Sequence, residues 1–265
     1  MHSLAFALPP IQWNWVWLVV AAFIGGVLNA VAGGGSFLVF PAMLGMGIPP
    51  VQANATNTVA LWAGQLTSIA AYRDDIRRNL RLALLMSLAG FIGGTIGAIV
   101  LLNTPQRTFL HLVPWLLLVA ALIFAVSGPV SRWLERRKTA AARTRAPRRL
   151  PIFLSTIVVC FYIGYFGAGA GFLIITLLSL FGFDDLNEIN ALKVAATTFA
   201  NGIAFVIFVF DGQVVWRYCL VAMLTCAIGG YTSASLARRV PQPILRASVV
   251  FIGLAMAAWF FWKNG

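Results

Sequence analysis

The stretch NAVAGGGSFLVFPAMLGMGIPPVQANATNTVALWAG, residues 29–64, contains three features that decide the architecture of this chain. The small residues Gly33–Ser36 interrupt an apolar run, the short apolar segment Phe37–Ile48 follows, and the next segment carries polar side chains at regular spacing. Inside hydrocarbon, a broken backbone persists only where protein or water satisfies its N–H and C=O groups. The stretch therefore predicts a helical membrane protein in which one segment is interrupted.

The composition of the whole chain favours the same class. Hydrophobic residues make up 60% of the 265 residues and charged residues only 10%, too few charges for the surface of a soluble protein. Apolar runs recur from Trp13 to Trp262, and each span needs about 20 mostly apolar residues. The net charge of +12 resides in short loops between these runs, where it indicates membrane orientation. We therefore expect the lipid bilayer as partner, no nucleic acid and no soluble domain.

The apolar runs form two series on either side of one basic stretch. This stretch, residues 131–150, contains eight Lys or Arg and one Glu and predicts a cytoplasmic linker. It divides the chain into a first membrane half, residues 1–130, and a second, residues 151–265. The predicted segments are 11–32, 37–48, 54–72, 82–102 and 108–128, then 151–167, 172–183, 190–210, 218–236 and 244–262.

Beyond the first hairpin, the two series match one another with a constant offset of 136 residues, and the glycine-rich turns align with a shift of one residue. Five segments per half would insert the halves in opposite orientations, and the basic loops agree with that arrangement. We therefore predict an all-α polytopic protein built from two inverted repeats, with both termini outside the cytoplasmic (inner) membrane. The matching positions are Asn54 and Asn190, Arg81 and Arg217, Gly93–Gly94 and Gly229–Gly230, and Pro105–Gln106 and Pro241–Gln242.

Two of the predicted segments are too short to cross a bilayer upright. As a helix, Phe37–Ile48 would cover about 18 Å of a hydrocarbon core about 30 Å thick, and Phe172–Phe183 has the same length. A re-entrant hairpin and two full crossings return the chain to the same side, so loop charges do not separate them. The expectation is eight full spans plus two short or re-entrant segments, or ten spans in all.

Glycine-rich breaks precede both short segments and are candidate parts of a binding site. Glycine permits unusual backbone angles, and helix N-termini near the membrane centre offer N–H donors suited to an anion. The alternative is tight helix packing, which small residues also allow. The breaks comprise Gly33, Gly34, Gly35 and Ser36 in the first half and Gly167, Gly169 and Gly171 in the second.

Polar side chains follow each short segment in two matching stripes, each roughly on one helix face. Carboxamides, hydroxyls and one ammonium group can donate several hydrogen bonds to an oxyanion. The alternative is that the amides join helices and that Lys193 snorkels to the interface. The first stripe consists of Asn54, Asn57 and Gln65, and the second consists of Asn190, Lys193 and Asn201, extended by Thr197. Thr56 flanks the first stripe, and these eight residues are the candidate substrate-binding residues.

The remaining ionisable residues limit the metal-binding and catalytic chemistry that can be expected of this chain. Every carboxylate maps to a loop or a segment end, which leaves Glu188 as a possible gate near Lys193. His2 and His111 are isolated, so we expect no metal site. The cysteines show no ligand spacing and are expected to be free, buried thiols. Without a nucleophile beside a base or a cofactor motif, we expect neither an enzyme nor a cofactor.

Residues 29–64 and the second-half segment INALKVAATTFANGIAFVIF, residues 189–208, resemble the TauE/SafE family of sulfite-exporter-like permeases. The likeness covers nearly the whole chain. It implies transport of sulfite, sulfoacetate or a related sulfur-containing or organic anion, often outward. The second half departs from the first at AGAG in place of GGGS and at Leu192–Lys193 in place of Thr56–Asn57, so an asymmetric site is expected.

The hypothesis is an alternating-access carrier in which the stripes and breaks enclose a small anion near the midplane. An anion channel, or an importer of another organic anion, is the main alternative, although the polar residues cluster in one band instead of lining a continuous path. A membrane enzyme would need a catalytic constellation, and a scaffold would not need paired polar stripes. The sequence leaves open the anion, the direction, the coupling ion and a possible homo-oligomer.

Overall fold

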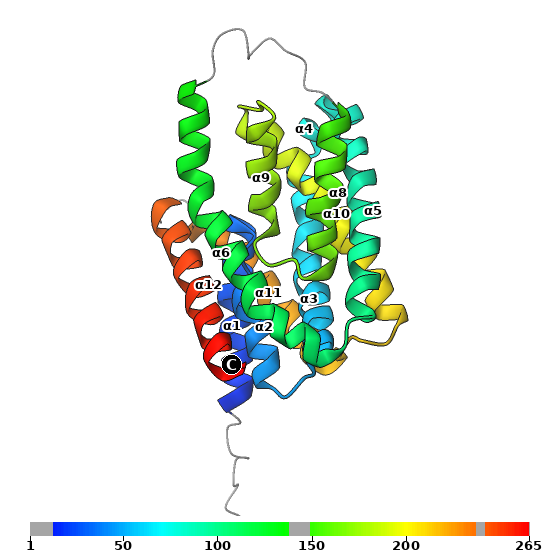
Figure 1. Cartoon of the computed structure of the whole chain (residues 1–265), viewed down its shortest axis with the longest axis vertical. Coiled ribbons are helices and arrows are strands. Elements are labelled where there is room, and N and C mark those ends of the chain that lie inside the picture. Colours follow the sequence, from blue (N-terminus) through cyan, green and yellow to red (C-terminus); the bar gives the residue numbers. More distant parts are fainter. Residues whose placement is uncertain (1–12, 138–148, 237–241, 265) are drawn as a thin grey trace, which may run out of the picture.

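The computed structural model describes residues 13–137, 149–236 and 242–264, and these residues form α-helices joined by short connections, without a β-strand. Most of the helices run along the long axis of the molecule (Figure 1). The predicted helical class is therefore confirmed for the described residues. The helices are α1 Trp13–Ala32, α2 Ser36–Gly45, α3 Pro50–Ala71, α4 Arg73–Arg78, α5 Leu80–Leu102, α6 Gln106–Arg137, α8 Arg149–Tyr165, α9 Ala170–Leu180, α10 Leu186–Phe210, α11 Trp216–Leu236 and α12 Gln242–Asn264.

The described helices follow the predicted apolar segments, with two exceptions. The sequence reasoning missed the short helix α4, which lies in a polar loop and buries none of its residues. It also ended the fifth segment at Gly128, whereas α6 continues to Arg137. The basic residues that begin the predicted linker exclude hydrocarbon but do not exclude a helix, because Arg and Glu are good helix formers. Residues 138–148 of the linker lie outside the described part.

Both glycine-rich breaks end one helix and start a short one. Gly33 has a φ of 70° and Gly167 a φ of 77°, values that glycine adopts at little cost. The amide of Gly33 donates to the Asn29 carbonyl at 2.9 Å, and that of Gly167 donates to the Tyr162 carbonyl at 3.0 Å. Each break thus turns the chain back: α2 lies in the lower half of the molecule and α9 in the upper half (Figure 1).

Small residues bring neighbouring helices into backbone contact. A Cβ atom on Gly97 of α5 would collide with the Phe161 carbonyl of α8, and one on Gly229 of α11 would collide with the Phe23 carbonyl of α1. Gly94 of α5 also faces α10 at Ala200. Close approach of this kind is how membrane helices gain packing energy. It joins α5 to α8 and α10, and joins α1 to α11.

Aromatic side chains fill the space between the helix pair α1–α2 and the helix pair α8–α9. The fully buried ring of Phe40 on α2 lies edge-on to Phe166, which directly precedes the second break, with 5.5 Å between the ring centroids. Phe40 also contacts Phe109 of α6 and Phe260 of α12. This cluster fixes the first short helix against the end of α8 and so positions the two breaks relative to each other.

The outer surface of the described bundle is apolar. Leu84, Val158 and Leu224 are 60%, 68% and 67% exposed, an arrangement that suits contact with lipid. Three helices are long and apolar enough to cross a membrane: Leu80–Leu102, Gln106–Ile123 and Asn187–Phe210. Shorter apolar helices include Asn14–Ala30, Arg149–Tyr165 and the two that follow the breaks.

The two ends of the bundle differ in charge. The basic helix α4 lies at the same end as the start of α8, which follows the basic stretch (Figure 1). The C-terminus and the first turn of α1 lie at the opposite end (Figure 1). The basic loop and the basic stretch therefore share one end, as the charge distribution predicts for a single membrane face.

Candidate functional site

The polar residues Asn54, Thr56 and Asn57 lie on the N-terminal half of α3 and are buried, whereas Gln65 lies further along and is half-buried. Asn54 is 1% exposed, and Thr56 and Asn57 are not exposed at all. Buried polar groups require hydrogen-bond partners, because each unpaired one costs about 1–3 kcal/mol. The partners of this stripe therefore show which elements its side chains hold.

These partners belong to the first break, to the end of α8 and to the connection before α11. The Asn57 Nδ2 atom donates to the Ser36 hydroxyl at 3.0 Å, within the first break. The Asn54 Nδ2 atom donates to the backbone carbonyl of Tyr165 at 3.0 Å, two residues before Gly167. The Asn57 amide thus contacts the first break, and the Asn54 amide contacts the end of α8, which leads into the second.

The side-chain oxygens of the same two amides have no hydrogen-bond partner among the described residues. The Oδ1 atoms of Asn54 and Asn57 are buried and accept no hydrogen bond from the described residues. Each Nδ2 group uses one of its two donors in the bonds above, and the second is available to an anion. Asn54 and Asn57 can therefore each donate one more hydrogen bond and accept others while they keep the bonds described above.

Thr56 lies elsewhere. Its hydroxyl accepts a hydrogen bond from the amide of Val215 at 3.0 Å, in the connection that leads to α11. This contact holds the start of the second half's fourth segment against α3. The structure therefore separates Thr56 from the two breaks, and the bond has a structural role.

The second stripe lies on α10 and centres on Lys193. The Lys193 ammonium donates to Asn190 Oδ1 at 3.0 Å, and no carboxylate in the described part lies within ion-pair distance of it. Thr197 and Asn201 donate to carbonyls of α10 itself, those of Lys193 and Thr197. An ammonium group in a membrane helix is costly unless it is paired, so an anion is its natural partner.

The two breaks meet beside this lysine. A Cβ atom on Gly171 would lie 3.6 Å from Lys193 Cδ and 3.7 Å from the Cα atom of Gly33. The turn between α1 and α2 therefore lies in van der Waals contact with the start of α9, and the aliphatic part of the Lys193 side chain lies beside them. Asn201 approaches the second break as well, because its Oδ1 atom lies 3.9 Å from the position of a Cβ on Gly167.

The helices α3 and α10 cross where their matching residues touch. Asn201 Nδ2 donates to Gln65 Oε1 at 3.3 Å, and Trp62 Nε1 donates to the Thr198 carbonyl at 3.1 Å. Both pairs are separated by 136 residues, the offset of the sequence match. Both contacts therefore join residues that the sequence match pairs with one another.

The sequence reasoning missed Trp62, which covers this crossing. Its ring stacks on Phe205 with 4.8 Å between centroids, and a Cβ on Gly202 would lie 3.3 Å from the indole. The offset contained the signal, because Thr198 stands 136 residues after Trp62. The stripes are defined by polar residues alone, so they do not include this apolar ring.

The predicted site glycines have different roles. A Cβ on Gly35 would collide with the Gly25 carbonyl and with Asn29 of α1, so Gly35 allows α2 to approach α1. Gly169 has a φ of 71° at the start of α9, a left-handed conformation that favours glycine. Gly34 is buried in the turn itself, and its amide donates to the Leu28 carbonyl at 3.5 Å. The packing interpretation of the sequence therefore fits the contacts of Gly35.

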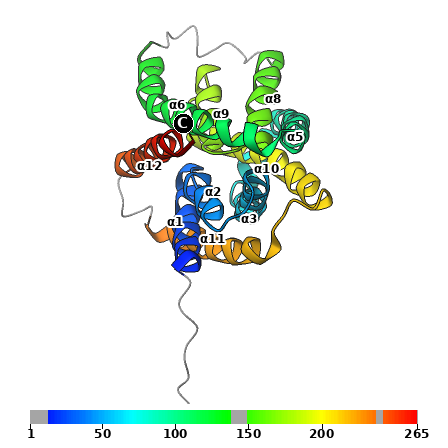
Figure 2. The same ribbon diagram turned by 60° about the horizontal axis from the view of Figure 1, so that its bottom comes forward.

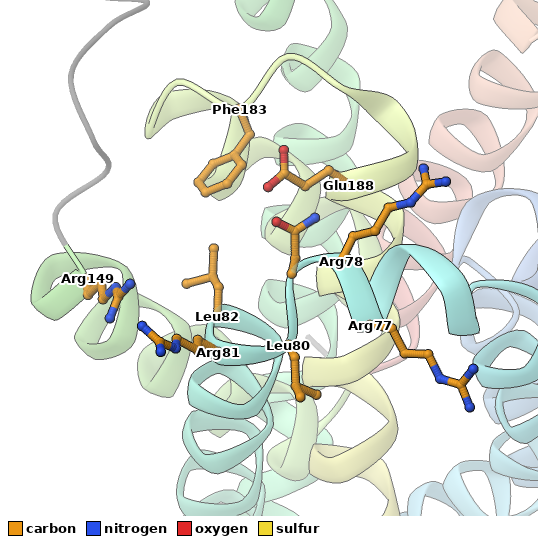
Figure 3. A pocket seen from close by; sticks show the side chains of 9 residues that line it. Arg77, Arg78, Leu80, Arg81, Leu82, Arg149, Phe183 and Glu188 are labelled. Carbon is orange, nitrogen blue, oxygen red and sulfur yellow. The ribbon is translucent and has the colours of Figure 1, made fainter.

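Glu188 lies in the first turn of α10, away from the meeting point of the breaks. It lines a cavity of about 580 Å³ at the basic end of the bundle, together with Arg78, Arg81 and Arg149 (Figure 3). The three cysteines are buried free thiols, as predicted. Among the described residues, no three His, Cys, Asp or Glu side chains gather into a group that could hold a metal ion.

Comparison with known proteins gives the chain a family. The model of the family described as "Sulfite exporter TauE/SafE" matches residues 18–260. The chain is similar to the "Probable membrane transporter protein ORF9" of Sinorhizobium sp, with 29% identity over 97% of this chain and 94% of that protein. A "Probable membrane transporter protein" of Haemophilus influenzae is 26% identical over 94% of each chain.

A third relative is the "Probable membrane transporter protein YfcA" of Escherichia coli K12, which is 26% identical over 91% of this chain and 87% of that protein. No solved structure matches the chain significantly. The names of the relatives favour transport over catalysis. Because the family model covers nearly all of the sequence and the described helices carry apolar outer faces, the chain belongs to the sulfite exporter TauE/SafE family and is an integral membrane transporter.

Proposed function

We propose that this transporter moves a small anion, a sulfur oxyanion such as sulfite or an organosulfonate such as sulfoacetate, by alternating access and in the outward direction. The anion binds where the two glycine-rich breaks meet, between α3 and α10. The family description names a sulfite exporter, which favours this substrate class and direction. An importer of another organic anion would use the same geometry.

The observation that carries the proposal is the ammonium group of Lys193. The stem that carries it passes the place where the breaks meet, because Lys193 Cδ would lie 3.6 Å from a Cβ on Gly171, and its one hydrogen bond to a described residue goes to the neutral Asn190. An anion at this place would gain a charge-assisted hydrogen bond from the lysine and neutral ones from nearby amides. A cationic substrate would meet the wrong charge, which is why we favour an anion.

Two inverted repeats would supply the two gates of such a carrier. The packing supports this, because α5 contacts α8 just as its equivalent α11 contacts α1, and α3 contacts its own equivalent α10. The two short helices lie at opposite ends of the molecule (Figure 1). We therefore propose that α1–α2 and α8–α9 are re-entrant hairpins from opposite faces of the inner membrane, with both termini outside.

Competition for exchange tests the substrate class. Purified protein in proteoliposomes loaded with unlabelled sulfite should accumulate labelled sulfite, and external sulfoacetate or thiosulfate should slow that uptake. Taurine, a zwitterion, should compete less well than sulfoacetate of similar size, because its ammonium group would approach Lys193. Uptake that responds only to added cations would overturn the proposal.

Replacing Asn57 tests whether the first break takes part. We expect Asn57→Ala to slow exchange about tenfold, the effect of losing one hydrogen bond at a site where it counts. If Asn57 acts by holding Ser36, the Asn57→Ala/Ser36→Ala double variant should be no slower than Asn57→Ala alone. Surface abundance of each variant serves as the control. Independent, additive losses would contradict a joint role for this pair.

A further inference from the structure

The cavity at the basic end of the bundle lies outside the proposed transport site. It occupies about 580 Å³ where the first residues of α5 and α8 meet the start of α10. Its lining combines arginines from α4, α5 and α8 with the apolar side chains of Phe183 and Leu82 (Figure 3). A cavity that combines guanidinium groups with apolar walls suits a ligand with both a charged and an apolar part.

The charges of this cavity are unbalanced. Arg81 and Arg149 come from different helices, yet their side chains point toward one another (Figure 3). Neither forms an ion pair with a carboxylate in the described part of the chain. Arg78 is 3.6 Å from Asp75, and Glu188 is the one acidic residue of the lining. Two facing guanidinium groups repel each other unless an anion lies between them, and a phosphate fits that geometry.

Rows of exposed apolar side chains, here called apolar tracks, extend from the cavity along α5 and α8. Leu80, Leu84 and Leu88 follow one another at intervals of one helical turn on α5 and are 50%, 60% and 54% exposed. On α8 the corresponding track consists of Leu150, Leu154 and Val158, which are 66%, 53% and 68% exposed. Figures 1 and 2 both show α5 and α8 side by side at the edge of the bundle.

We propose that this cavity binds the phosphate headgroup of an anionic phospholipid, with the acyl chains lying along the tracks on α5 and α8. Arg81 and Arg149 grip the phosphate oxygens, and Phe183 covers the glycerol region. A free oxyanion would use the arginines alone, whereas the tracks that begin at the rim favour a lipid. Basic cavities between helices at one face of a membrane protein suit such headgroups.

Lipid binding to the purified full-length protein in detergent tests the proposal. Native mass spectrometry should show retained phosphatidylglycerol, with phosphatidylcholine at the same concentration retained far less. Arg81→Gln/Arg149→Gln should weaken phosphatidylglycerol binding at least about tenfold, since each arginine near a headgroup contributes appreciably. The matched control is Arg107→Gln, an exposed arginine at the other end of α5–α6, which should leave binding unchanged.

Two further measurements separate the lipid from a free anion. Glycerol phosphate carries the headgroup without the chains, so it should compete poorly with phosphatidylglycerol. Leu84→Gln/Leu154→Gln keeps the arginines and should weaken retention of the lipid alone. Equal competition by glycerol phosphate, or unchanged lipid retention in the double arginine variant, would overturn the proposal. Both outcomes are independent of whether sulfite exchange is observed.

Discussion

Lys193→Met should reduce sulfite exchange about 100-fold or more while the protein still inserts and purifies as the wild type does. Loss of one partner from a desolvated, hydrogen-bonded charge pair typically costs 2–5 kcal/mol or more, and each 1.4 kcal/mol is a factor of ten. Methionine keeps the length and the apolar stem that contacts Gly171. The loss would therefore report the charge, measured as the initial rate of labelled-sulfite exchange in proteoliposomes.

Two comparisons make this result specific to the ammonium group. Lys193→Arg keeps the charge and should retain part of the activity, with a raised KM because the larger planar group shifts the contact with Asn190. Arg107→Gln removes a positive charge from an exposed position at the opposite end of the bundle and should exchange normally. If Lys193 merely snorkels toward the interface, Lys193→Met will exchange sulfite at the wild-type rate, which contradicts the proposed site.

Gly97→Val should destabilise the whole bundle. A Cβ atom at this position would overlap the Phe161 carbonyl and the backbone of Gly164 and Tyr165, so α5 and α8 must separate. Overpacking of a well-fitted interior costs about 1–3 kcal/mol, and more where rigid backbone is the obstacle. We expect a lower melting temperature and reduced yield of the monodisperse protein, measured by size-exclusion chromatography after heating.

Gly45→Val is the matched control for this variant. Gly45 ends α2, and a Cβ atom there would meet nothing within 4 Å. The same type of change should therefore leave the melting temperature within a degree or two of wild type, since surface substitutions away from such contacts usually have small effects. Equal stability of the Gly97 and Gly45 variants would show that α5 and α8 are not in backbone contact.

The sequence predicted the helices well because apolar runs mark contact with lipid directly. The breaks at Gly33 and Gly167 were found for the same reason, since a glycine cluster stands out in an apolar run. The helix α4 was missed because five of its six residues are charged and none is fully buried. The extension of α6 was missed because charge was taken to end the helix, although it limits only the depth in the membrane.

The candidate site was harder to predict, because its contacts join residues far apart in the chain. The sequence placed Asn54 in the stripe and Thr56 beside it, yet only the tertiary structure separates the Asn54 bond to Tyr165, near a break, from the Thr56 bond to Val215. Gly35 looks like Gly33 in sequence but packs against α1 at Gly25 and Asn29. To predict the role of Trp62, the offset of 136 residues must be applied to apolar residues as well as to polar ones.

Labelled-sulfite counterflow in proteoliposomes tests the central claim most directly. A carrier that binds the anion at Lys193 will accumulate labelled sulfite transiently above its external concentration when the vesicles contain excess unlabelled sulfite. The account predicts this overshoot for the wild type and its loss in Lys193→Met. Passive equilibration of the label without an overshoot, accompanied by a sulfite-dependent conductance, would identify a channel and contradict the account.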